Sequence, residues 1–151
     1  MKRSVLTILI LCPLVVCAAN WDRYQVKTIG EETSRLSPKG SGTVIVSETS
    51  IRTRVLYRES GRAIEKKKRQ FIADWLRKNN LPKEHLALFG SEIQVFEGDK
   101  SYWIPIQNGL MDALWKEHGK FPAYIDVYVV LIGFINGEPV MLLNRYDLAS
   151  N

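Results

Sequence analysis

Two long apolar runs near the end of the chain decide the fold: YIDVYVVLIGFI at 124–135 and EPVMLLNRYD at 138–147, separated by Asn136 and Gly137. An Asn-Gly pair accepts positive φ at both turn positions, as a tight hairpin between right-twisted strands requires. Apolar residues occupy both faces of these strands, because Val127 and Val129 alternate with Val130 and Ile132. Strands that are apolar on both faces are usually covered on both. We therefore expect a central β-hairpin with one or both helices packed on it.

Two further hairpins are predicted upstream. Residues 92–96 and 101–106 flank the turn-like segment 97–100 and read as a hairpin. Residues 43–47 form a β-branched run, and 51–58 alternate between apolar and basic residues with the period of a half-buried strand. Because Glu48-Thr49-Ser50 lies between these last two runs, the sequence predicts a turn there and a first hairpin.

Two segments have helical spacing. Residues 62–79 place an apolar stripe on one side, formed by Ile64, Phe71, Ile72, Trp75 and Leu76. Residues 108–118 form a shorter pattern that ends before Gly119, a common helix stop. Taken in order, the predicted elements are ββ-α-ββ-α-ββ.

This order predicts an α+β domain over residues 43–151 with an antiparallel sheet of about five to six strands. A helix that precedes a final hairpin resembles the OB-fold, in which a helix plugs a partly open barrel. The polar stretch 20–42 ends in SPKGSG at 37–42 and is predicted to be an arm or linker that adds at most one short strand or turn.

The segment from Trp103 to Gln107, with the following helix and the apolar hairpin through Gly133, resembles the ending of some small exported bacterial proteins of unknown function. These share a Trp-x-Pro-x-Gln motif, a helix and an apolar hairpin. The resemblance covers the last third of the chain and implies export, but it assigns no catalytic residue.

The first nineteen residues have the pattern of a cleavable export signal. Lys2 and Arg3 precede an apolar run that closes with the small residues Cys17, Ala18 and Ala19. The run is shorter than the roughly 20 residues that cross a bilayer, which disfavours an uncleaved anchor. Lipidation of Cys17 is also disfavoured, because the residue before it is Val16 and not a small one. We expect a periplasmic or secreted protein.

Cysteine usage and charge restrict the chemistry of the exported part. The two cysteines both lie within residues 1–19, so residues 20–151 hold no disulfide, thiol nucleophile or thiolate ligand. The formal net charge of +5 falls to +3 once Lys2 and Arg3 are removed. This mild basic balance favours acidic partners, while the expected compartment argues against nucleic acid.

No catalytic, metal or cofactor motif stands out. His85 and His118 are isolated in the sequence, and neither a Gly-x-Ser-x-Gly elbow nor a phosphate-binding glycine motif is present. We therefore predict no cofactor and no metal. A pair of carboxylates acting on a glycan stays open, with Asp112, Glu117 and Asp126 as candidates.

Two groups of residues indicate binding. Three arginines form a ladder on one face of the predicted strand 51–58, and their planar guanidinium groups are suited to binding carboxylate or phosphate. Four aromatic residues offer stacking surfaces if they are exposed. The candidate binding residues are Arg52, Arg54, Arg58, Tyr102, Trp103, Tyr124 and Tyr128. The basic helix around residues 66–69 is expected to be a solvated face, since its apolar residues serve the core.

The function predicted from these residues is an exported, non-enzymatic binding or interaction module that contacts an acidic envelope component or a protein partner. Two alternatives stay open. One is an envelope glycan hydrolase that uses unmarked carboxylates. The other is a membrane-tethered accessory subunit, if the signal is retained or Cys17 is lipidated.

Overall fold

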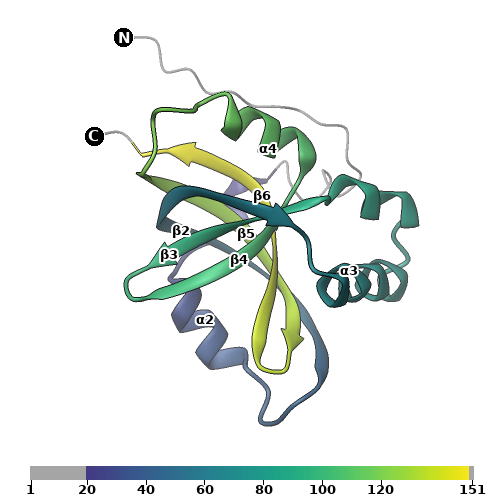
Figure 1. The fold of residues 1–151 in the computed structure, drawn as a ribbon. Coiled ribbons are helices and arrows are strands. Elements are labelled where there is room, and N and C mark those ends of the chain that lie inside the picture. Colours follow the sequence, from purple (N-terminus) through teal and green to yellow (C-terminus); the bar gives the residue numbers. More distant parts are fainter. Residues whose placement is uncertain (1–19, 150–151) are drawn as a thin grey trace.

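The computed structural model describes residues 20–149 and is built around a six-stranded mixed sheet that curls into a partial ring (Figure 1). The predicted export signal at 1–19 lies outside the described residues. The ring strands are β2 (Thr43–Ala63), β3 (Ser91–Glu97), β4 (Lys100–Ile106), β5 (Ala123–Ile135) and β6 (Glu138–Leu148). The sixth strand, β1 (Gln25–Val26), pairs with the outer edge of β2.

The α+β class is confirmed, but the sheet is not purely antiparallel. The strand order is β1-β2-β3-β4-β6-β5, and β2 also pairs with β5, which joins the second strand of the order to the last. β1 runs parallel to β2, and β4 runs parallel to β6 through the single pair Ile106 and Leu143. Because that seam is one residue pair wide, the ring closes only in part.

The predicted first hairpin is wrong, because residues 43–63 form one continuous strand. The polar residues that resemble a turn lie in a bulge instead. Three residues of β2 stand between Ile45 and Thr49, where β5 has only Ile132 between their partners. β5 is long enough to pair with β2 on both sides of the bulge, so no chain reversal is needed.

The second and third hairpins lie where the alternation predicts them. β3 and β4 pair in unbroken register from Ser91 with Ile106 to Glu97 with Lys100. β5 and β6 meet at the Asn136-Gly137 turn, where both residues have positive φ, 50° and 83°. The observed order of ring strands and helices is β2-α3-β3-β4-α4-β5-β6, with further elements before β2.

The helices α3 (Lys66–Lys78) and α4 (Asn108–Trp115) correspond to the two predicted ones, although α3 begins four residues later because β2 extends to Ala63. α3 is followed by the 3-10 helix η2 (Lys83–Leu88). α3 packs across one face of the sheet, and α4 covers one end of the ring (Figure 1).

Two apolar clusters confirm that the C-terminal hairpin is covered on both faces. Val127, Val129 and their neighbours face the interior of the ring, while Val130 and Ile132 pack with Phe71 and other residues of α3. All of these side chains are at most 4% exposed. The period-two pattern of β5 thus supplies the ring interior with one set of residues and the helix-covered layer with the other.

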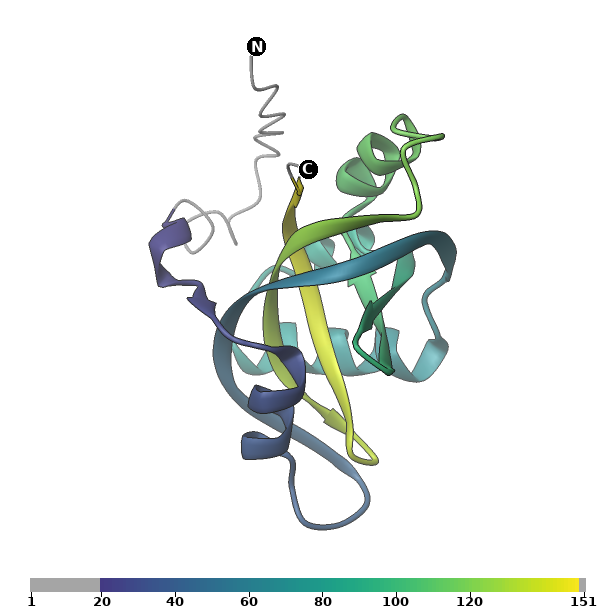
Figure 2. The ribbon, with the colours of Figure 1, turned by 90° about the vertical axis from the view of Figure 1, so that its left-hand side faces the viewer.

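The segment 20–42, expected to be an arm or linker, carries η1 (Trp21–Arg23), β1 and the helix α2 (Ile29–Leu36). Figure 2 shows β1 and α2 lying along the outer side of β2. Ile29 is fully buried in the ring cluster, and the Glu97 carboxylate accepts hydrogen bonds from the backbone N–H groups of Ile29 and Gly30 at 2.8 and 2.9 Å. A carboxylate at a helix N-terminus satisfies unpaired donors and favours the helix dipole.

Candidate binding surface

Outward-facing side chains of the ring bring most of the predicted binding residues onto one surface. Along β2, Ile51, Thr53, Val55 and Tyr57 are buried, and the alternate residues Arg52, Arg54 and Leu56 point outward. Register then aligns outward residues of neighbouring strands in rows. One row runs from Arg52 through Tyr128 to Arg145, and the next from Arg54 through Asp126 to Asp147.

The first part of this surface, the paired arginine patch, consists of Arg52, Arg54, Arg145, Asp126 and Asp147. Arg54 donates to both oxygens of Asp126 at 2.8 and 3.3 Å, and Arg52 donates to one of them at 3.4 Å. Arg145 binds Asp147 through Nε and Nη2 at 2.9–3.0 Å. Three guanidinium groups therefore face two carboxylates, and most of their charge is neutralised locally.

The pKa values on this patch follow from those contacts. The hydrogen bond from Arg54 lowers the pKa of Asp126, against the opposing effect of partial burial. Burial raises the pKa of Tyr128, and the nearby carboxylate of Asp147 adds to the effect. Both groups hold their ordinary charge at neutral pH.

An aromatic cluster adjoins the paired arginine patch. The rings of Trp21, Tyr24 and Tyr128 lie 5.4–5.6 Å apart between centroids. Arg52 and Arg145 stand over the Tyr128 ring at 5.3 and 4.9 Å. Tyr128 was predicted to be a binding residue, but its side chain is only 5% exposed. Its ring packs against Trp21 and Tyr24 and leaves little area for a ligand.

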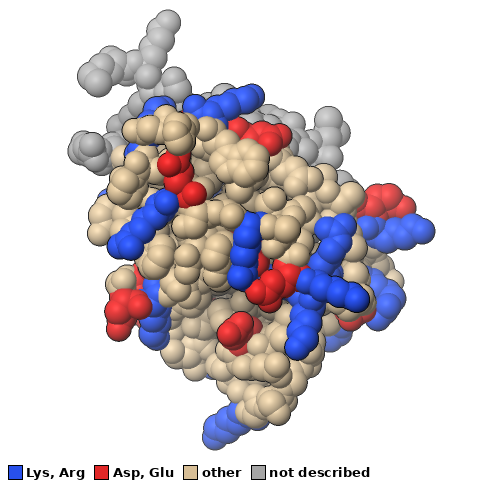
Figure 3. Space-filling view, in the orientation of Figure 1, with Lys and Arg blue, Asp and Glu red and all other residues tan. Residues whose placement is uncertain are grey.

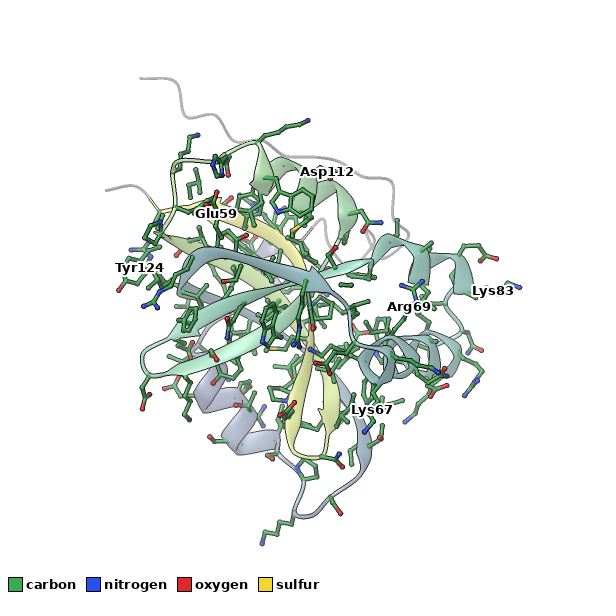
Figure 4. All side chains as sticks on the ribbon, viewed as in Figure 1. Glu59, Lys67, Arg69, Lys83, Asp112 and Tyr124 are labelled. Atoms are coloured by element: carbon green, nitrogen blue, oxygen red, sulfur yellow. The ribbon has the colours of Figure 1, made fainter. Side chains whose placement is uncertain are left out.

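The second part of the surface, the Arg58 patch, consists of Leu56, Arg58, Phe96, Tyr124 and Trp103. Leu56 pairs with Phe96 on one side and with Tyr124 on the other, so these three form a row across the strands. Tyr124 is 59% exposed and lies at the outer edge of the ring (Figure 4). Trp103 lies one row further along β4, opposite Gln94.

Arg58 differs from the other two arginines of the ladder. Its guanidinium carbon lies 4.6 Å from the centroid of the Phe96 ring, a cation–π contact, and within residues 20–149 it makes no ion pair. A second bulge displaces it, because three residues of β2 stand between Tyr57 and Gly61 where β3 has only Gln94. Arg58 therefore presents a charge without an ion pair among the described residues, beside the half-buried Phe96 and in the same patch as the exposed Tyr124.

Trp103 is covered by a structural ion network. Arg62 lies over its ring at 4.0 Å and donates to Glu92 at 2.7 Å. Tyr102, one residue earlier, faces the ring interior, where burial raises its pKa. Because side chains alternate along β4, Tyr102 does not belong to the Arg58 patch, and Trp103 lies at the border of that patch.

Phe96, Leu56 and Arg145 are surface members that the sequence did not single out. Phe96 could have been found, because the alternation of residues 92–96 places it on the same face as Gln94. Arg145 could not, since only the register of β6 against β5 brings it opposite Tyr128.

Residues weighed for catalysis are engaged in other contacts or exposed. Glu117 accepts a hydrogen bond from the Tyr146 hydroxyl at 3.1 Å, and Asp112 is exposed on α4 (Figure 4). His118 bonds Glu59 at 2.5 Å, which ties the segment after α4 to the second bulge of β2. Within residues 20–149, no group of three or more potential ligands is arranged to hold a metal ion.

Charges elsewhere on the viewed face are mixed. Figure 3 shows basic and acidic side chains side by side, with basic ones gathered over α3. Lys67 and Arg69 lie on this helix (Figure 4). No helix among the described residues is long and apolar enough to cross a membrane.

Comparisons with known proteins add no family to this description, since no family model, no curated protein and no solved structure matches the chain.

Proposed function

We propose that this protein is an exported, non-enzymatic binding module whose Arg58 patch contacts an acidic envelope polymer. The observation that carries the proposal is the contrast among the three arginines of β2. Arg52 and Arg54 share Asp126, whereas Arg58 stacks on Phe96 without an ion pair within residues 20–149. A planar, unneutralised guanidinium beside aromatic rings is suited to a carboxylate or phosphate carried on a sugar chain.

The topology supports the same surface. We interpret the ring as an OB-like barrel, because α4 precedes the final hairpin and the first ring strand pairs with two neighbours. OB-folds bind oligosaccharides and oligonucleotides on the face of their second and third strands. Those strands correspond to β3 and β4, which carry Phe96 and Trp103. Export disfavours the nucleic acid and leaves the glycan.

Acid–base hydrolysis receives less support. Asp126 and Asp147 lie opposite each other, but arginines bind both, and the pKa of Asp126 is lowered. A general acid needs a raised pKa to carry a proton at neutral pH.

Binding can be tested with protein purified from cells that express the full chain, using polygalacturonate as the acidic polymer and dextran as a neutral one. We expect salt-sensitive binding to polygalacturonate alone, weakened about fivefold or more by Arg58→Gln. Arg54→Gln is the matched control and should change the affinity less than twofold, since Asp126 already neutralises that charge. Equal losses from the two variants would refute the role of Arg58.

Photo-crosslinking from positions 58 and 124 in living cells tests the partner directly. Adducts with a heterogeneous polymer agree with the proposal, whereas a discrete protein adduct would overturn it in favour of a protein partner. The intact mass of the purified protein tests export, since cleavage predicts a chain that begins at Ala19 or Asn20 and carries no lipid.

A further inference from the structure

A polar cleft of about 680 Å³ lies between α2, β1 and the first bulge of β2, on residues that the Arg58 patch does not use. The cleft is shallow and open to solvent, with room for a small molecule held at the surface. Its lining is charged and hydroxylated, and it includes Arg23, Lys27, Arg35, Glu48, Thr49 and Ser50.

A buried carboxylate holds two of these cations in place. Glu32 is only 2% exposed and accepts two hydrogen bonds from Arg35, at 2.8 and 2.9 Å, and one from Lys27 at 3.2 Å. The hydrogen bonds from Arg35 lower the pKa of Glu32 to about 2. The carboxylate therefore stays ionised and orients both cations at neutral pH.

The same two cations keep donors for a ligand. An ammonium group has three N–H donors and a guanidinium has five, and Glu32 uses one and two of them, respectively. The side chains of Lys27 and Arg35 are 37% and 58% exposed, so their remaining donors reach solvent in the cleft.

Backbone pairing with β2 positions one wall of the cleft. The Lys27 N–H donates to the Arg52 carbonyl at 3.2 Å, and Gln25 pairs with Ile51. On the other wall, the bulge before Thr49 turns the chain so that Glu48, Thr49 and Ser50 line the cleft. A preformed site costs little ordering on binding.

The charges and hydroxyls define the ligand. Lys27 and Arg35 carry two positive charges around the single carboxylate of Glu32, which leaves one net positive charge at this end of the cleft. Neutral hydrogen-bonding groups come from Thr49, Ser50 and Gln25. We propose that the cleft binds a small sugar bearing one anionic group, with the anion at Lys27 and Arg35 and the sugar hydroxyls toward Thr49 and Ser50.

This site goes beyond the proposed polymer contact and does not depend on it. A carboxylate and a phosphate can accept hydrogen bonds from the same donors, so three sugars are needed to tell which anion the cleft binds. Glucuronate carries the carboxylate, glucose 6-phosphate carries the phosphate, and glucose is the neutral control. Glu48 places a negative charge on the rim, which disfavours the dianionic phosphate and favours glucuronate.

The test is calorimetric titration of the purified full-length product with the three sugars. We expect saturable binding of glucuronate, weaker binding of glucose 6-phosphate and none of glucose. Lys27→Met should weaken glucuronate binding about tenfold. Lys39→Met is the matched control, because Lys39 is an exposed lysine outside the cleft lining, and it should leave the affinity unchanged.

A second variant keeps the outcome decisive if Lys27→Met fails to fold. Glu48→Gln leaves the Glu32 contacts intact and should tighten glucose 6-phosphate binding severalfold. Acidic sugars that bind no better than glucose, or a Glu48→Gln variant with unaltered phosphate affinity, would overturn the proposal. Loss of polygalacturonate binding alone would count against the Arg58 patch and not against this cleft.

Discussion

The buried carboxylate of Glu92 provides the sharpest test of the structure. Glu92 is fully buried and receives hydrogen bonds from Arg62 at 2.7 Å and from Lys68 at 2.5 Å. The Lys68 side chain is 12% exposed and also donates to the Trp103 carbonyl at 3.0 Å. Glu92→Gln keeps the shape of the side chain but leaves the Lys68 ammonium facing a neutral amide.

The expected cost follows from the unequal burial of the two cations. Removing one partner of a buried ion pair costs about 3–5 kcal/mol, because the remaining charge stays out of water. Lys68 is in that position. Arg62 is 39% exposed and still pairs with Glu65 at 2.7 Å, so it adds at most about 1 kcal/mol. We expect the free energy of unfolding to fall by about 3–5 kcal/mol and Tm by about 10–15 °C.

Urea unfolding measures this change directly. The midpoint should shift with an unchanged m-value, since the surface exposed on unfolding is the same. The control is Glu92→Leu combined with Lys68→Met, which removes both buried charges. Apolar replacement of a buried pair is often nearly neutral, so the double variant should be more stable than Glu92→Gln. A loss below about 1 kcal/mol for Glu92→Gln would refute the reasoning, because Lys68 would then be well solvated.

Three other changes have expected outcomes. Gly133→Ala should lower the free energy of unfolding by about 3 kcal/mol in chemical denaturation, since an added Cβ would overlap the β2 backbone and the Phe71 ring. Below pH 4.5, the wild type should lose stability as pH falls toward 2, because the pKa of Glu32 is lowered from 4.5 to about 2 and protonation removes its ionic hydrogen bonds. Urea unfolding of Glu32→Gln across this pH range should lack the part of the stability loss that comes from Glu32. Asp126→Asn releases the charge of Arg54 and should strengthen polygalacturonate binding about threefold at low salt, an effect that titration in high salt should abolish.

Local periodicity was sufficient for the C-terminal half of the fold. The residues of β5 alternate between two apolar sets, and the Asn136-Gly137 pair specifies its turn, so pattern and turn chemistry agree. The same reasoning failed for β2. Glu48-Thr49-Ser50 has turn composition, and nothing near it in the sequence shows that β5 pairs with the chain on both sides of the bulge. That information is held in contacts about eighty residues away.

The surface was predictable in composition but not in charge. Alternation correctly placed Arg52 and Arg54 outward, but their neutralisation depends on Asp126, more than seventy residues later in the chain. Trp103 and Tyr102 were both candidates because the sequence does not say which face of β4 is covered. Only the folded ring shows that Arg52 and Arg54 share an ion pair with Asp126 while Arg58 has none among the described residues.

Both proposed sites depend on irregularities in one strand. The first bulge of β2 brings Glu48 and Thr49 to the wall of the cleft, and the second displaces Arg58 toward Phe96. Between the bulges, Ile51 and Val55 are fully buried and hold the strand against the ring core. Bulges redirect side chains while the flanking ladder stays paired, so each site has a rigid support. Ligand binding at either site should therefore leave the backbone of β2 unchanged, and the two sites should bind their ligands independently of each other.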